Sequence, residues 1–143
     1  MWADRGAEYT DDVEIVLHAI VFADKAIEEN NGKKGLIGIF QSFNFSQFPT
    51  VAPTWYVYIA FGNVAKGRHD VTVNVVHDDT GSVIVRSHGE VQVRTPATDV
   101  EIVFPMAGAA FRAPGVHWLT VTLDQTQIGS RVLHVGQHPE DTR

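Results

Sequence analysis

The sequence contains no cysteine, and this absence excludes several chemistries at once. Disulfide bonds, thiolate metal ligands and thiol nucleophiles all require that side chain. The chain also has no run of basic residues longer than Lys33-Lys34, and its formal net charge is −6. Proteins that bind nucleic acids or anionic membranes by neutralising phosphates carry clustered positive charge. We therefore expect neither nucleic acid nor a membrane as a partner.

Long apolar runs are absent as well. No stretch approaches the roughly 20 apolar residues that a membrane-spanning helix requires. The first residues, Met1 to Gly6, lack the basic and then apolar regions of a secretory signal. These features predict a soluble cytoplasmic protein.

Leucine is scarce, whereas residues branched at Cβ are abundant. The chain has 20 Val and 9 Ile but only 5 Leu. Branching at Cβ restricts χ1 and suits a pleated sheet, whereas leucine is typical of helical cores. Turn signals recur at the spacing expected of a sandwich or barrel. The sequence therefore predicts an all-β domain of seven to nine short antiparallel strands over residues 13–135, between a flexible leader (1–12) and a flexible tail (136–143).

The aromatic residues concentrate between Gly35 and Phe61. We expect an apolar strand over Val13–Phe22 that is buried on both faces, with a short helix over Phe22–Glu29 as the alternative. The turn-forming residues 30–32 would return the chain into a strand over Gly35–Phe45. Pro49 and Pro53 then bracket a crossing between two sheets, because proline cannot donate to a sheet ladder. The strands Gly35–Phe45 and Trp55–Phe61 are predicted to be central.

Three later segments alternate between apolar and polar residues, which predicts strands with one buried face. The inward residues are predicted to be Trp55, Val57, Ile59 and Phe61; Val71, Val73 and Val75; and His117, Leu119, Val121 and Leu123. A loop over residues 106–113 is expected to place Phe111 beneath the sandwich.

Several of these segments together resemble a family of small bacterial proteins known only as a domain of unknown function. The residues that carry the resemblance are the apolar first strand, Gly35-Leu-Ile-Gly-Ile-Phe40, Phe48-Pro49, the alternating stretch from Gly67 to Val75, and the Pro114-Gly115…Asp124 hairpin. The resemblance implies an immunoglobulin-like β-sandwich and brings no activity or site residues. Tyrosine is common at the position that His117 occupies in such hairpins, so a tyrosine-corner hydrogen bond is not assumed here.

The seven histidines do not predict a metal site. His117 shares the inward phase of its strand and His134 the outward phase of the next one, so they should not share a ligand. His69 and His77 are eight residues apart, or roughly 26 Å along a strand. No H-x-H or H-E-x-x-H spacing exists. His77, Asp78 and Asp79 occupy a predicted hairpin turn, where they form the alternative hypothesis of a small-ligand or carbohydrate site at a loop end.

No motif predicts an enzyme. The sequence lacks a G-x-S-x-G nucleophile motif, a phosphate-binding glycine loop and a G-x-G-x-x-G motif. We therefore expect no cofactor and assign no catalytic residue. An enzyme whose site leaves no trace in the sequence stays as an alternative.

Tyr56 and Tyr58 lie out of phase with the apolar face of their strand, and Trp118 does the same in the last hairpin. Exposed tyrosine and tryptophan side chains are typical of surfaces that bind sugars, peptides or another subunit. The alternative is that both faces of the strand are covered, or that the aromatics are exposed singly. The first hypothesis is therefore a non-catalytic interaction module that forms a homo-oligomer or binds an unidentified protein, with Tyr56, Tyr58 and Trp118 at its surface.

Overall fold

The computed structural model describes residues 14–95 and 98–143, and every regular element within them is a β-strand. The strands are β1 (Val16–Glu28), β2 (Lys34–Phe40), β3 (Ser42–Phe45), β4 (Thr50–Val51), β5 (Trp55–Val64), β6 (Gly67–His77), β7 (Val83–Val93), β8 (Thr98–Met106), β9 (Ala110–Phe111), β10 (Gly115–Leu123) and β11 (Thr126–Gln137). The described residues form no helix that is able to cross a membrane.

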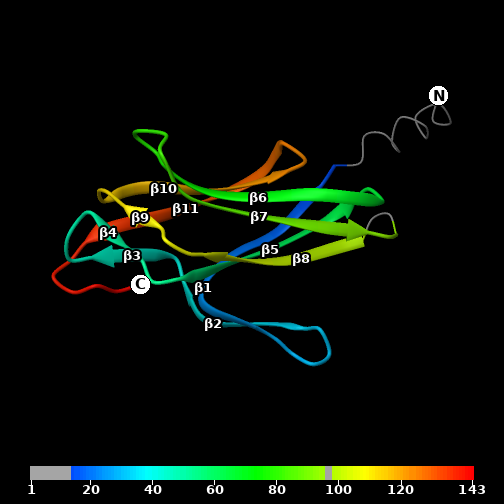
Figure 1. Ribbon diagram of the computed structural model, residues 1–143, viewed down its shortest axis with the longest axis horizontal. Helices are drawn as coiled ribbons and strands as arrows, with labels where there is room; N and C mark the ends of the chain where they lie inside the picture. Colours follow the sequence, from blue (N-terminus) through cyan, green and yellow to red (C-terminus); the bar gives the residue numbers. More distant parts are fainter. Residues whose placement is uncertain (1–13, 96–97) are drawn as a thin grey trace.

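Two sheets pack face to face to form a β-sandwich (Figure 1). One sheet has four strands in the order β2-β1-β5-β8, and the other has five in the order β3-β11-β10-β6-β7. The short strands β4 and β9 pair separately. The all-β fold predicted from the sequence is confirmed. The structure adds short strands to the predicted set, and the β3–β11 pair is parallel rather than antiparallel. The finer immunoglobulin-like assignment stays a prediction.

The predicted inward phases are confirmed, because all of the side chains assigned to them are buried. At one end of the core the aromatic rings gather around Trp55. The Phe22, Phe40 and Phe43 rings lie 5.6, 5.7 and 5.3 Å from the Trp55 ring. Phe111 is fully buried in the same cluster, as the sequence predicted. These contacts join β1, β2, β3, β5 and β9 across both sheets.

The predicted strand Gly35–Phe45 is wrong, because the chain leaves one sheet for the other after Phe40. A continuous strand would place Phe40 on one face, and Phe43 and Phe45 on the opposite face. All three rings are buried, and the break at Gln41 makes this possible. Consequently β2 is an edge strand rather than a central one, whereas β5 lies between β1 and β8 as expected. The chain returns to the first sheet across the predicted proline-bounded crossing.

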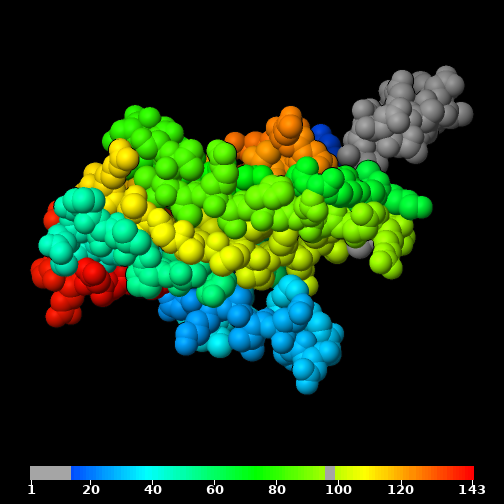
Figure 2. Space-filling model, viewed as in Figure 1, coloured from blue at the N-terminus to red at the C-terminus, as the bar shows by residue number. Residues whose placement is uncertain are grey.

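The prediction that the first strand is buried on both faces is also wrong. Strand β1 continues to Glu28 without a helix and forms a long hairpin with β2. The end of this hairpin stands out from the body of the sandwich (Figure 2). Because little lies over that end, Ile27 is 52% exposed. At the opposite end of β1, Val16 is 43% exposed.

The C-terminal end of the domain differs from a simple sandwich with a loose terminus. The predicted leader lies outside the described residues. At the other end, β11 extends to Gln137, and the backbone of Thr142 exchanges hydrogen bonds of 2.7 and 2.8 Å with Asn44 of β3. The guanidinium of Arg143 lies 3.1 Å from the carboxylate of Asp24 in β1. The tail that was predicted to be flexible is therefore bound to both sheets.

Candidate functional site

Alternation along β5 directs Tyr56 and Tyr58 to the outer face of the four-stranded sheet. Both side chains are half-buried. Their neighbours across the strands are Ala23 and Val21 of β1, and Pro105 and Val103 of β8. This outer face is therefore largely apolar around the two tyrosines.

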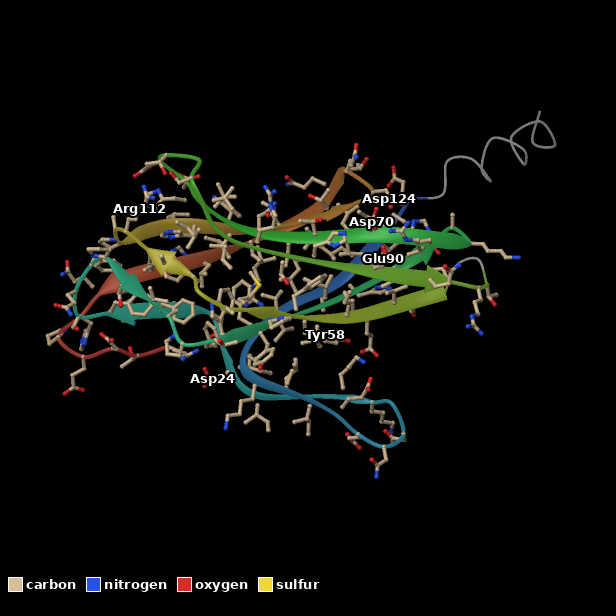
Figure 3. The ribbon with its side chains drawn as sticks, in the orientation of Figure 1. Asp24, Tyr58, Asp70, Glu90, Arg112 and Asp124 are labelled. Carbon is tan, nitrogen blue, oxygen red and sulfur yellow. The ribbon has the colours of Figure 1, made fainter. Side chains whose placement is uncertain are left out.

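The two tyrosine hydroxyls differ in their partners. The Tyr58 hydroxyl donates a hydrogen bond to the carboxylate of Glu101, and Figure 3 shows Tyr58 on this side of the sandwich. Burial raises the pKa of Tyr58 to about 12, and the hydrogen bond to the negatively charged Glu101 acts in the same direction. The Tyr56 hydroxyl has no hydrogen-bond partner among residues 14–95 and 98–143. Of these two tyrosines, Tyr56 is the one whose hydroxyl is free to meet another molecule.

A hollow of about 460 Å³ lies between the projecting hairpin and strands β5 and β8. Tyr56 lines it together with Ile27, Lys34 and Glu101. Lys34 Nζ lies 2.5 Å from Oε1 of Glu28, which also lines the hollow. The hydrogen bond from Lys34, together with its positive charge, lowers the pKa of the Glu28 carboxyl below its ordinary value. Glu90 and Glu101 line the hollow as well, so it combines acidic groups with the apolar side chains beside Tyr56.

Three isoleucines continue the apolar surface along the hairpin. The exposed fractions of Ile27, Ile37 and Ile39 are 52%, 52% and 57%. In the register of β1 and β2, Ile37 lies opposite Lys25 and Ile39 opposite Ala23. Residues opposite each other in a sheet, and residues two apart in a strand, share a face. All three isoleucines therefore face the same side as Tyr56.

Trp118, which the sequence analysis grouped with the tyrosines, lies on the other side of the molecule. It points outward from β10 in the five-stranded sheet and is 37% exposed. Its indole Nε1 donates a 3.1 Å hydrogen bond to Oδ1 of Asp78. The predicted surface of Tyr56, Tyr58 and Trp118 is thus split between two opposite faces.

Trp118 is instead brought together with part of the alternative site. A second hollow of about 460 Å³ is lined by Val76, His77, Asp78, Gly81, Trp118, Thr120, Gln127 and Ser130. Of the three residues proposed for that alternative, His77 and Asp78 line the hollow. Asp79 does not, although its backbone N–H donates to Nδ1 of His77 at 3.2 Å. The sequence analysis did not foresee that Trp118 and Asp78 belong to one site.

His77 and His117 form a buried pair at one end of the sandwich. The sequence placed His117 inward, and it is completely buried, whereas the predicted outward orientation of His134 agrees with its exposure. Nδ1 of His117 lies 3.1 Å from the carbonyl oxygen of Gly115. Burial lowers the pKa of His117, the Gly115 hydrogen bond opposes this, and the nearby His77 lowers it further.

A charged cluster at the opposite end of the five-stranded sheet was missed by the sequence analysis. Nδ1 of His69 lies 2.5 Å from Oδ2 of Asp124, and Oδ1 of Asp124 accepts a 2.9 Å bond from the backbone N–H of Asp70. Arg68 pairs with Asp70 and Glu90, and Figure 3 shows Asp70, Glu90 and Asp124 close together. The sequence feature that could have indicated this cluster is Asp124, which lies in a predicted turn. Sequence alone does not reveal which strand end lies beside that turn.

The described ranges hold no group of three or more histidine, cysteine, aspartate or glutamate side chains placed to bind a metal ion. The arrangements that remain are two surfaces with different chemistry. One is apolar, over β1, β2 and β5, and the other is polar around Trp118.

Comparison with known proteins gives a family but no activity. No curated protein matches the sequence. A model for a family of unknown function, DUF6941, matches residues 18–136. This match includes most of the strands of both sheets. It agrees with the resemblance seen in the sequence, and the chain belongs to this family of unknown function.

Proposed function

We propose that this protein is a non-catalytic interaction module that associates with a second copy of itself through β2 and the outer face of the four-stranded sheet. The observation that carries the proposal is the exposure of Ile27, Ile37 and Ile39, each by more than half, on one face of a projecting hairpin. Contiguous exposed apolar patches are typical of protein interaction sites, whereas single exposed apolar residues are ordinary.

The edge position of β2 supports association by strand pairing. An edge strand presents unpaired N–H and C=O groups that another strand can bind. Other edges of the sandwich carry features that hinder such pairing. Strand β3 is covered by the backbone of Thr142, and β8 contains Pro105, which has no N–H. Strand β7 carries the charged or polar side chains Arg86, His88 and Glu90 along its length. Strand β2 has lysine only at its start and isoleucine at its centre.

The sequence of β2 suits antiparallel pairing with itself about a two-fold axis at Ile37. In that register Ile37 meets its own copy, and Ile39 lies opposite Gly35 of the second chain. Gly35 has no side chain, and Ile27 of its own chain lies directly beside it. Ile39 of one copy would therefore pack over Gly35 and against Ile27 of the other. The Lys34 residues would lie at opposite ends, so they would not repel each other.

Tyr56 lies in β5, two strands inward from β2, and would flank this interface. It faces the same side as the isoleucines, and its hydroxyl is free. Tyrosine combines a large apolar area with a polar tip and is enriched at interfaces for that reason. Tyr58 would contribute its ring alone, since its hydroxyl is bound to Glu101.

The test is the mass of the full chain in solution, measured by light scattering after size-exclusion chromatography over a range of concentrations. We expect a dimer at micromolar concentration and a monomer for Ile37→Lys, because the lysine charges would meet at the two-fold axis. Val83→Lys is the matched control. Val83 is 50% exposed on β7, an edge strand of the other sheet, so its replacement should leave the dimer intact.

Amide hydrogen exchange adds a measurement at the level of the strand. In the dimer, the N–H groups of β2 that point away from β1 should exchange more slowly than in Ile37→Lys. A wild-type chain that is monomeric throughout the concentration range contradicts the proposal. A dimer that persists unchanged in both Ile37→Lys and Ile39→Lys would place the interface elsewhere and would also overturn it.

A further inference from the structure

The outer face of the five-stranded sheet carries a hollow built around one exposed indole. Trp118 stands at its edge, and its Nε1 is held by Asp78, so the orientation of the ring is fixed. Val76 lies directly opposite Trp118 in the neighbouring strand β6 and also lines the hollow. Val132 lies opposite Trp118 in β11, so the indole and these valines form a short apolar strip on this face.

Polar side chains that make no hydrogen bond within the described part of the chain lie on the other side of this strip. Thr120 follows Trp118 on the same face of β10, and Ser130 lies opposite Thr120 in β11. Gln127 lines the hollow as well. Within the described part of the chain, the side chains of Thr120, Gln127 and Ser130 have no hydrogen-bond partner. They offer hydroxyl and amide groups that both donate and accept.

The charges of the hollow restrict the class of ligand. Asp78 is its only acidic residue, and the lining contains no lysine or arginine. A phosphate or carboxylate would meet no cation there and would be repelled by Asp78. A neutral ligand that can donate hydrogen bonds to a carboxylate is therefore favoured.

We propose that this hollow binds an uncharged carbohydrate. A sugar ring has an apolar C–H face that can lie against the oriented Trp118 and Val76. The hydroxyl groups at its edge can bond to Thr120, Ser130 and the free oxygen of Asp78. Ligand sites in general combine apolar walls with a few placed polar groups, and the hollow has this composition. The site is on the face opposite to β2, so it does not depend on the proposed self-association.

A neighbouring hollow indicates that the ligand is longer than one sugar residue. It measures about 350 Å³ and is lined by Asp70, Thr72, Asn74, Arg86, His88, Thr122 and Gln125. Thr122 lies two residues after Thr120 on the same face of β10, so the two hollows succeed each other along the strand. An oligosaccharide that follows β10 would reach both.

The test is a titration of the full isotope-labelled chain, followed by ¹H–¹⁵N NMR, with cellohexaose, maltohexaose and chitohexaose at millimolar concentration. The indole signal of Trp118 is assigned from the spectrum of Trp118→Phe. We expect at least one hexasaccharide to shift that signal together with the amide signals of Thr120 and Ser130. Glucose should produce a weaker response than the hexasaccharide. Replacement of Trp118 by alanine should weaken binding at least about tenfold, or about 1.4 kcal/mol.

Paired variants separate a binding role from a structural one. Thr120→Val combined with Ser130→Ala removes the hydroxyl groups with little change in volume and should weaken binding, whereas Thr126→Val in the exposed turn should not. Ile37→Lys should bind the sugar as the wild type does. The proposal is overturned if no hexasaccharide shifts the Trp118 signal, or if Trp118→Ala and the hydroxyl-deleted variant bind as well as wild type. It is also overturned if choline chloride shifts the signal and the sugars do not, because a cation would then be the ligand of Asp78 and the Trp118 ring.

Discussion

The imidazole rings of His77 and His117 meet edge to face with their centroids 4.6 Å apart. Nδ1 of His77 accepts from the backbone N–H of Asp79, so the proton of this neutral ring is on Nε2. Nδ1 of His117 faces the Gly115 carbonyl oxygen, which only accepts, so its proton is on Nδ1. Neither Nε2 atom has a protein partner among the described residues. The buried His117 ring is therefore suited to its neutral form, and burial disfavours an added charge on it.

The first prediction is a loss of stability in acid that depends on His117. Its pKa in the folded state is below the ordinary value of 6.5, so the unfolded chain binds the proton more tightly. The stability that His117 confers is complete above about pH 6.5 and is lost as the pH falls toward the lowered pKa. In the wild type, the urea concentration at the unfolding midpoint should decrease as the pH is lowered through this range. His117→Leu should reduce that slope, and His134→Leu, at an exposed histidine, should keep it. Equal slopes in all three proteins would contradict the prediction.

The second prediction has the opposite sign and concerns His69. Burial lowers the pKa of His69, but hydrogen bonds to Asp124 and to the Ala65 carbonyl oxygen, with the charge of Asp124, raise it above its ordinary value overall. The stability from this ion pair is complete below about pH 6.5 and is lost as the pH rises through the raised pKa. Asp124→Asn keeps an acceptor for the Asp70 N–H and tolerates the positive φ of 49°.

This variant therefore removes the charge with little other change. We expect Asp124→Asn to lower the free energy of unfolding by about 0.5–1 kcal/mol near pH 6, because Asp124 is half exposed and the pair is screened by solvent. The difference from wild type should shrink as the pH is raised to about 9, because His69 loses its proton as the pH rises through its raised pKa. Urea denaturation at the two pH values measures it. A difference that is as large in alkali as in acid would show that the turn, not the ion pair, is responsible.

The parts of the fold that follow from alternation were predictable, whereas those that depend on contacts between distant segments were not. The phases of Trp55–Phe61 and of the strand that begins at His117 could be read directly, since apolar residues at every second position need one buried face. The break at Gln41 was missed because the sequence fits a continuous strand as well as a crossing between sheets. The two differ only in whether Phe40, Phe43 and Phe45 are all buried. That outcome depends on Trp55 and Phe111, which come later in the chain.

The candidate surfaces were predictable to a similar extent. Phase alone showed that Tyr56, Tyr58 and Trp118 point outward, but not that they lie on opposite sheets. That assignment requires the strand order. The pairing of Trp118 with Asp78 depends on the register between β6 and β10. No local pattern marks a contact across 40 positions of sequence.

The third prediction concerns the turn between β10 and β11. Asp124 and Gln125 both have positive φ, at 49° and 72°, as in the hairpin turns that favour Asn-Gly. A left-handed conformation costs a non-glycine residue roughly 1–2 kcal/mol, and glycine avoids this cost at an entropic penalty of roughly 0.5–1 kcal/mol. Gln125→Gly should therefore stabilise the protein by about 0.5–1 kcal/mol in thermal or urea unfolding.

The matched control for this turn is Gln92→Gly, at an exposed position in the extended strand β7. There glycine gains nothing from its conformational freedom and should destabilise the protein by about 0.5–1 kcal/mol. If Gln125→Gly destabilises the protein as Gln92→Gly does, then the side chain of Gln125 contributes more to the free energy of unfolding than its backbone strain costs.

The fourth prediction uses the hydroxyl of Tyr58. Its pKa of about 12, against an ordinary value of 10.0, means that the folded protein holds this proton more tightly than the unfolded chain. The stability linked to Tyr58 is therefore complete below about pH 10 and is lost as the pH rises toward 12. Tyr58→Phe should flatten the fall of the unfolding midpoint over this range and should remove the last step of tyrosinate absorbance. Tyr56→Phe, whose hydroxyl has no partner in the described structure, should retain both features. If Tyr58→Phe keeps the last absorbance step, that step belongs to another tyrosine, and the prediction of a raised pKa for Tyr58 is contradicted.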